Sequence, residues 1–228
     1  MKKIIIFVFM TVVFALPASA DMGTDFRDHF QAGALADYNR DVSAMIGLAD
    51  LHIGQSATFP AFSVGASVSA IKTSSDNFSS QDYFYVPYVT AQTQLPFFNL
   101  GVALRGTTYD GFNSIGMGVK WNKSLLFFDL NASVFYDRYN TDYYDGDHFS
   151  VSTVASVSLL AFTPYVGVGY DYSGIKTKNM GLSASSYDGA ARCSVGVSFA
   201  PIPFVHAYGA YTVSEYNQGF QGGLGVSF

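Results

Sequence analysis

The residues with the most obvious capacity for chemistry are acidic, histidine and tyrosine side chains gathered within seven positions. They are Asp142, Tyr143, Tyr144, Asp145, Asp147 and His148. An imidazole beside carboxylates can position a water molecule or bind a metal ion. These residues crowd one stretch, however, and no recognised ligand or triad spacing matches them. The stretch is therefore predicted to be a solvated acidic surface loop, and we assign no catalytic residue, metal or cofactor.

A second set of ionisable residues lies in segments where apolar and small polar residues alternate. The set comprises Arg105, Lys120, Asp129, Asp137, Asp171, Arg192 and His206. Each falls on the non-apolar face of its segment, so in a closed sheet all would point inward. Because unpaired charges in a narrow interior are costly, they are expected to form a paired network. The alternative is a constriction that selects solutes by charge.

Period-two alternation runs through most of the chain after position 60 and predicts β-strands. Segment 126–137 is about as long as the ~9–11 residues that a tilted strand needs to cross a bilayer. The predicted strands are 62–69, 83–95, 100–105, 115–121, 126–137, 149–159, 165–172, 191–199, 205–212 and 220–228. Ten is an even number, as in single-chain bacterial barrels.

The predicted fold class is therefore all-β, a transmembrane antiparallel β-barrel of ten strands over residues 61–228. Eight strands would result if residues 83–109 were irregular, since Pro87 removes a hydrogen-bond donor there. Twelve would result if residues 42–53 contributed. A secreted β-sandwich is the soluble alternative.

The composition agrees with a membrane barrel. Mean hydropathy is +0.21, aromatic residues make up 17% of the chain, and charged residues only 13%. No apolar run after residue 20 approaches the ~18 residues of a membrane helix. Apolar composition without long apolar runs is what alternation produces.

The first twenty residues indicate secretion. Lys2 and Lys3 precede an apolar run, and Ala18-Ser19-Ala20 forms a small-residue cleavage site, so residues 1–20 are predicted to be a signal peptide cleaved after Ala20. The mature chain then has ten basic and seventeen acidic residues, a net charge of −7. This balance offers no basic patch for nucleic acid.

Residues 21–60 differ from the rest because charged side chains are densest there. Phe26, Phe30, Ala34 and Tyr38 recur every four residues, which predicts a short amphipathic helix. Residues 42–53 could extend this helix or form a strand. We expect the segment to plug the barrel or brace its periplasmic end, with a flexible tail as the alternative.

The connections between predicted strands alternate in length. The short ones, 96–99, 122–124, 160–163 and 200–203, are expected to be periplasmic turns. The outer connections are expected to include the longer segments 72–82, 138–148 and 174–187. Short turns on the inside and longer loops outside follow the rule for outer-membrane barrels.

The last strand carries a family resemblance. Leu224, Val226 and the terminal Phe228 share one apolar face. A strand that ends in this way resembles the last strand of small Gram-negative bacterial outer-membrane β-barrel proteins. The resemblance implies insertion by the barrel assembly machinery and contact with outer-membrane lipid.

A ten-stranded barrel encloses a lumen between filled barrels of about eight strands and open porins of 16–18. We therefore expect a narrow or gated pore for small solutes. The alternatives are a non-conducting barrel that displays surface-binding loops, and an outer-membrane hydrolase. The hydrolase alternative stems from ten-stranded outer-membrane proteases, which are similar in placing His and Asp at the outer rim.

Overall fold

The computed structural model describes residues 22–51, 61–73, 83–96, 98–202 and 204–228. The predicted signal peptide and the cleavage site after Ala20 lie outside these ranges and stay predictions. The domain boundaries at residues 20 and 60 likewise stay predictions.

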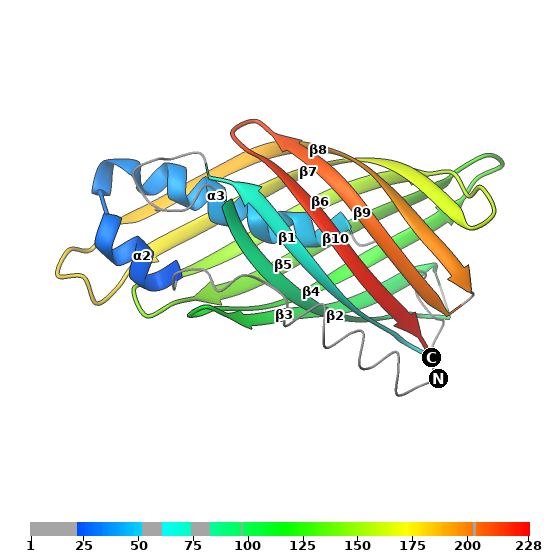
Figure 1. Ribbon diagram of the computed structural model, residues 1–228, viewed down its shortest axis with the longest axis horizontal. Coiled ribbons are helices and arrows are strands. Elements are labelled where there is room, and N and C mark those ends of the chain that lie inside the picture. The colour runs from blue at the N-terminus through cyan, green and yellow to red at the C-terminus, as the bar shows by residue number, and fades with distance from the viewer. Residues whose placement is uncertain (1–21, 52–60, 74–82, 97, 203) are drawn as a thin grey trace.

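Ten antiparallel strands form a closed barrel (Figure 1). Each strand pairs with its neighbours in sequence, and pairing of the first with the last closes the wall, with Val64 opposite Val226. The strands are β1 (Ser63–Lys72), β2 (Tyr83–Gln94), β3 (Leu100–Tyr109), β4 (Phe112–Ser124), β5 (Asp129–Asn140), β6 (Tyr144–Ser156), β7 (Phe162–Thr177), β8 (Ser185–Ile202), β9 (Val205–Ser214) and β10 (Gln218–Ser227). The ten-stranded antiparallel barrel is therefore confirmed.

The two faces of the wall are those that the alternation predicts. Leu104, Ile115 and Val168 are 59%, 72% and 58% exposed on the outside. Arg105 and Ser114, one position along from the first two, are buried in the interior. Alternating side chains thus give the barrel an apolar outer band and a polar inner wall.

Several strands begin or end elsewhere than predicted. The predicted segment 126–137 becomes β5, which starts three residues later, and Leu126 and Phe127 project from the preceding turn at 94% and 84% exposure. At the other end, β5 and β6 continue through the predicted outer loop 138–148 and leave residues 141–143 as the connection. The strands extend because Tyr139 and Tyr144 pack inward, where both are almost fully buried. The predicted outer loop 174–187 similarly shortens to residues 178–184, whereas most of the predicted loop 72–82 lies outside the described residues.

The inner-wall glycines accommodate large side chains from the neighbouring strand. A Cβ atom at Gly118 would lie 2.4 Å from a ring carbon of Phe135, its direct partner on β5. The same holds for Gly223 opposite Tyr208, where the distance would be 2.5 Å. Five further pairs repeat the arrangement: Gly116 with Asp137, Gly146 with Tyr139, Gly169 with Arg192, Gly196 with Tyr165, and Gly225 with His206. These glycines therefore provide room for specific side chains.

The described amino-terminal residues form helices, including residues 42–51, for which a strand was the alternative. They are α2 (Met22–His29), the 3-10 turn η1 (Ala32–Ala34), α3 (Leu35–Leu48) and the 3-10 turn η2 (Ala49–Leu51), together called the N-terminal segment, residues 22–51. The predicted single helix through Phe26 and Tyr38 is interrupted at residues 30–34, where Gly33 is exposed. Among the described residues, no helix is long and apolar enough to cross a membrane.

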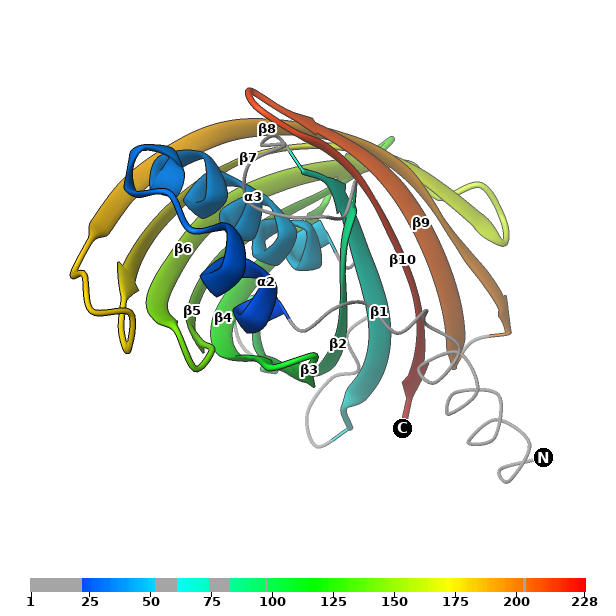
Figure 2. The same cartoon turned by 60° about the vertical axis from the view of Figure 1, so that its left-hand side comes forward.

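The N-terminal segment lies inside the barrel and reaches the end away from Phe228 (Figures 1 and 2). The backbone N–H of Met22 donates to the carbonyl of Asp110, in the turn between β3 and β4, at 3.1 Å. From there α3 runs into the lumen against β7, β8 and β1. We expected the segment to plug the barrel or to brace its periplasmic end. Its helices lie within the barrel and pack against inward-facing aromatic residues such as Phe84 and Tyr144, at the end away from Phe228.

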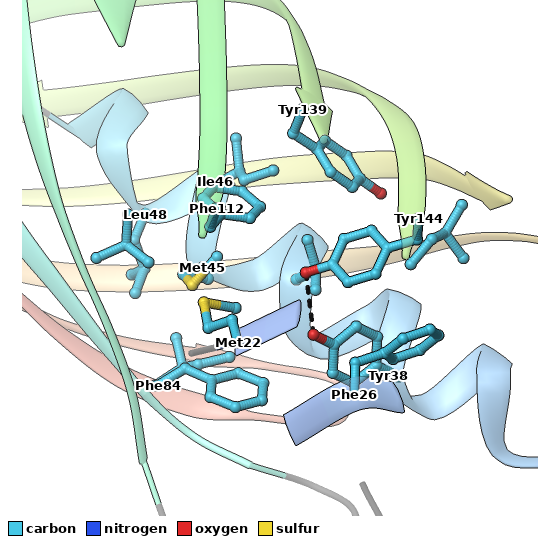
Figure 3. Packing of buried hydrophobic residues seen from close by; sticks show 14 of the residues in the cluster. Met22, Phe26, Tyr38, Met45, Ile46, Leu48, Phe84, Phe112, Tyr139 and Tyr144 are labelled. Carbon is cyan, nitrogen blue, oxygen red and sulfur yellow. Dashed lines mark hydrogen bonds between the residues drawn. The ribbon is translucent and has the colours of Figure 1, made fainter. Parts of the chain in front are cut away.

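An aromatic and aliphatic cluster joins the helices to that end of the barrel (Figure 3). The rings of Phe26 and Tyr38 are tilted by 45° with their centroids 4.7 Å apart, and Tyr144 meets Phe26 edge-on at 4.8 Å. The hydroxyl groups of Tyr38 and Tyr144 are 3.0 Å apart. The other buried members are Met22, Leu35, Val42, Met45, Ile46, Leu48, Ala49, Ile71, Phe84, Val86, Tyr88, Phe112, Tyr139 and Ile175. Contacts of this kind stabilise the packing of the helices in the barrel, because they bury apolar surface and pair aromatic rings.

The carboxyl end of β10 has the predicted faces. Leu224 and Val226 point outward from the wall, and Phe228 is 67% exposed. The backbone N–H of Phe228 donates to the carbonyl of Phe62 at 2.8 Å, and the two rings lie 5.5 Å apart. The terminal residue therefore takes part in closing the barrel. Its role as an assembly signal stays a prediction.

Candidate functional site

Charged side chains meet across the middle of the lumen. Five come from the barrel wall and one from η2 of the N-terminal segment. We call them the charge ring: Asp50, Arg105, Asp137, His148, Asp171 and Arg192. No side chain in the ring is more than 3% exposed. Charges that are buried to this extent must be paired, and each member of the ring has two ion-pair partners within the ring.

Asp50 is the only ring member from the N-terminal segment, and it links two arginines. Arg105 on β3 donates from Nη1 to Asp50 Oδ1. Arg192 on β8 donates from Nη2 to Asp50 Oδ2 at 2.7 Å. Each carboxylate oxygen thus receives its own guanidinium donor, an arrangement of charge-assisted hydrogen bonds. Asp50 thereby connects opposite parts of the wall through the segment.

Both arginines also contact residues of the wall. Arg105 donates to both oxygens of Asp137, from Nε at 2.7 Å and from Nη2 at 2.5 Å. Its guanidinium also lies 4.3 Å from the ring centre of Phe135, a cation–π arrangement. Arg192 Nε lies 3.0 Å from Asp171 Oδ2. The guanidinium plane of Arg105 is therefore held by β5, whereas Arg192 has an ion pair to β7 and donates its hydrogen bonds to Gly47 and Asp50 of the N-terminal segment.

His148 completes the ring between the two wall carboxylates. Its Nδ1 lies 3.2 Å from Asp137 Oδ2, and its Nε2 lies 3.4 Å from Asp171 Oδ1. We expected His148 in a surface loop, and this is wrong because it lies on β6 with a fully buried side chain. The local acidic composition suggested a loop, whereas strand alternation turns this imidazole toward the lumen.

The other predicted loop residues divide between the connection and the strand. Asp142 and Tyr143 lie in the connection, whereas Tyr144, Asp145 and Asp147 lie on β6. Tyr144 is buried in the aromatic cluster, and Asp147 accepts a hydrogen bond from Tyr136 on the outside at 2.5 Å. The six residues therefore do not form one surface site. Among the described residues, no cluster of three or more His, Cys, Asp or Glu could hold a metal ion.

Close approach of the helix to the wall depends on Gly47. A Cβ atom at this position would lie 2.5 Å from the carboxylate oxygens of Asp171. The carbonyl of Gly47 accepts a hydrogen bond from Arg192 Nη1. Any larger residue would push the end of α3 away from β7, so a glycine here lets the following turn deliver Asp50 to the arginines.

Three residues predicted to face the lumen lie outside the ring. Lys120 donates to Gln92 Oε1 at 2.9 Å and lies 5.7 Å from the ring centre of Phe135. His206 is buried opposite Gly225, and Asp129 is partly exposed at the Phe228 end of β5. Four of the seven predicted lumen residues, Arg105, Asp137, Asp171 and Arg192, are thus brought together, and these three are not.

Sequence reasoning missed the role of Asp50. The residue belongs to the charge-dense stretch that we expected to lodge in the barrel, but no spacing or motif distinguishes it from the other aspartates there. A position just after an apolar helical stripe was its only signal. The depth to which that helix enters the lumen is a tertiary property.

Further polar contacts attach the N-terminal segment to the end of the barrel away from Phe228. Arg40 on α3 contacts Asp188 at 2.6 Å and lies 4.0 Å from the ring centre of Tyr216. Burial lowers the pKa of Arg40, but the hydrogen bond and charge of Asp188 outweigh it and raise the pKa overall. Arg27 on α2 donates to the hydroxyl of Tyr143 at 2.8 Å. These contacts are more exposed than the charge ring and therefore contribute less to the stability of the docked segment.

No protein-family model matches the sequence, and no curated protein matches it. Solved structures do match. An outer-membrane channel from Pseudomonas putida F1 matches with a TM-score of 0.53 and 7% identity, over 78% of this chain and 100% of that one. The translocator domain of the autotransporter NalP from Neisseria meningitidis matches with a TM-score of 0.46 and 11% identity, over 90% and 99%.

A third match is the KdgM porin, with a TM-score of 0.42 and 8% identity, over 73% of this chain and 99% of that chain. At these identities the likeness concerns the fold alone. A shared fold does not by itself assign an activity. The protein thus has the fold of the bacterial outer-membrane β-barrels.

Proposed function

We propose that the protein is a gated pore for small solutes in the bacterial outer membrane, and that the N-terminal segment is its gate. The charge ring carries this proposal. At mid-barrel the segment is attached by ion pairs and hydrogen bonds, chiefly through Asp50. A lumen surface that presents arginine, aspartate and serine suits water once the segment leaves.

The inner wall supports a polar path beyond the ring. Buried hydroxyl side chains line both halves of the lumen: Ser63, Ser67, Ser69, Thr90, Ser114, Ser150, Ser152, Ser156, Ser173, Ser194, Ser198 and Thr212. An apolar plug against an apolar wall would favour a permanently filled barrel. A polar wall has a lower cost of rehydration, so displacement of the segment is feasible.

The proposed orientation places the Phe228 end toward the periplasm. The outer apolar band and the closed strand pairing satisfy what a bilayer demands of a spanning structure. In this orientation the aromatic cluster and α2 lie at the cell-surface end.

Planar-bilayer conductance tests the gate. The intact mature protein is compared with a variant lacking residues 21–55, both inserted from the same detergent. We expect little or no current from the intact protein and a steady current from the shortened one. Silence in both, with the barrel folded as judged by heat-modifiable gel migration, would overturn the pore proposal. Equal conductance in both would retain a pore but remove the gate.

A non-conducting barrel with a binding surface is the second candidate, and the aromatic cluster favours it. Phe26, Tyr38 and Tyr144 are at most 1% exposed and fill the end of the barrel away from Phe228. A filled end of this size would suit permanent closure. The deletion alone does not separate the candidates, because both predict a silent intact barrel and an open shortened one. Openings of the intact protein in long recordings support the gate, and an intact protein that never opens supports permanent closure. We do not propose an enzyme, since His148 is enclosed in the charge ring.

A further inference from the structure

We propose that Arg105 and Arg192 form a carboxylate-binding clamp in the lumen, and that Asp50 occupies this clamp as a tethered ligand. The solutes of the pore would then include small molecules that carry a carboxylate, and these would compete with Asp50. This assignment of solute class rests on the proposed gated pore. The clamp itself can be tested without any measurement of current.

The geometry of the clamp is that of a site for one planar anion. The two guanidinium groups come from β3 and β8 and meet at the carboxylate of Asp50. One donates to Oδ1 and the other to Oδ2. Arginine is the residue best suited to such recognition, because its planar donors match the two oxygens of a carboxylate.

Each arginine of the clamp also contacts a carboxylate of the wall. Arg105 remains paired with both oxygens of Asp137 and stacked on Phe135, and Arg192 remains beside Asp171. When Asp50 leaves, Nη1 of Arg105 and Nη2 of Arg192 lose their acceptor. Buried donors without an acceptor are costly, so a free carboxylate that restores both hydrogen bonds should bind.

The charge of the wall also suits one added anion. Without Asp50, the ring holds two guanidinium groups against the carboxylates of Asp137 and Asp171, with the imidazole of His148 between those carboxylates. The wall is therefore neutral with a neutral imidazole and carries one positive charge with a protonated one. Neither state opposes a monoanion as an acidic wall would.

Chemical rescue tests the clamp. Asp50→Gly removes a group equivalent to acetate, and Asp50→Ala removes one equivalent to formate. The midpoint of heat-induced loss of the folded gel form is measured with sodium acetate or sodium formate and, at equal concentration, with sodium chloride or sodium phosphate. Both variants should unfold at lower temperature than the wild type, and the matching carboxylate should raise their midpoints in a saturable manner.

The specificity of the rescue decides the outcome. For Asp50→Gly, the concentration that gives half of the maximal stabilisation should be at least tenfold lower for acetate than for chloride. Acetate should not stabilise the wild type, whose clamp is occupied by Asp50. Adding Arg192→Gln to Asp50→Gly should abolish the rescue. Equal rescue by chloride, stronger rescue by phosphate, or equal stabilisation of the wild type would overturn the carboxylate clamp.

A current measurement separates this proposal from the gated pore. In the variant lacking residues 21–55, millimolar acetate should reduce the chloride current by occupying the clamp. A silent channel with intact acetate rescue of Asp50→Gly defeats the pore and retains the clamp. A conducting channel without rescue in either Asp50 variant defeats the clamp and retains the pore.

Discussion

Asp50→Ala should release the N-terminal segment from the barrel wall while leaving the wall intact. The substitution removes the two buried ion pairs that join η2 to Arg105 and Arg192, whose side chains are at most 2% exposed. Loss of one partner from a buried pair costs about 3–5 kcal/mol. The lower end, about 3 kcal/mol, applies because each arginine keeps a wall carboxylate, and it corresponds to roughly a hundredfold shift toward the released segment.

Limited proteolysis of the folded barrel in detergent measures this shift. When release and return are fast relative to cleavage, the rate of cleavage follows the population of the released form. Cleavage within residues 22–51 should therefore accelerate about a hundredfold in Asp50→Ala, by the same arithmetic. Cleavage of the barrel strands should not change, because the wall pairings of Asp137 and Asp171 remain.

Asp28→Ala is the matched control, since it removes an aspartate from the same segment. The side chain of Asp28 is 51% exposed and pairs with Arg27 at the surface of α2. An exposed pair of this kind contributes little, so cleavage should stay close to that of the wild type. If Asp50→Ala and Asp28→Ala were cleaved at the same rate, the charge ring would not be what holds the segment.

Further predictions concern the wall. Val134→Arg places a charge on the apolar outer face and should cost up to about 2–4 kcal/mol near the bilayer midplane, whereas Ser133→Arg should act by crowding the lumen; equal, mild effects in lipid refolding assays would contradict the face assignment. Deleting Phe228 should lower outer-membrane levels without altering signal cleavage, and normal levels would count against a terminal assembly signal. Gly118→Ala should destabilise the barrel by about 1–3 kcal/mol by displacing the Phe135 ring, which lies 2.4 Å from its Cβ position. Gly209→Ala, whose Cβ would meet only a carbonyl at 3.9 Å, should be almost neutral, and similar losses in both would refute the crowding argument.

The barrel was predictable because alternation is a local signal that repeats ten times. The faces of residues such as Val134 and Arg105 follow directly from period two. The ends of strands were less predictable, because they depend on what the interior contains. Tyr139 and Tyr144 extend β5 and β6 into the predicted loop by packing against helices whose position the local sequence does not reveal. Aspartate and glycine in that stretch resemble a loop when the helices are ignored.

The candidate site was predictable only in part. Alternation placed Arg105 and Asp137 on the inner face. Because burying an unpaired charge costs free energy, they were expected to be paired. Alternation could not show that Asp50 bridges to Arg192, because that contact joins residues 142 positions apart through a helix of unknown depth. His148 was predicted in a loop for a related reason. Its acidic neighbours indicated a loop, although alternation along a strand would have turned its side chain inward.

A cysteine pair tests the gate most directly. A Cβ atom at Gly47 would lie 2.6 Å from Asp171 Cγ, so with a carbon–carbon bond of about 1.5 Å the two Cβ positions are at most about 4 Å apart. This separation is within reach of a disulfide. Gly47→Cys with Asp171→Cys, in a Cys193→Ser background, should therefore bridge α3 to β7. Gly33→Cys with Asp171→Cys should not, because Gly33 has no neighbour within 4 Å of its Cβ position.

The decisive measurement is the single-channel current of the bridged Gly47→Cys and Asp171→Cys protein before and after reduction. The bridge should hold the segment in the lumen and keep the current at baseline. Reduction should start the current when the protein also carries Asp50→Ala, because the ion pairs of Asp50 with Arg105 and Arg192 that hold the segment are then absent. An unchanged current on reduction of this variant, with bridge formation verified by mass, would contradict gating by the N-terminal segment.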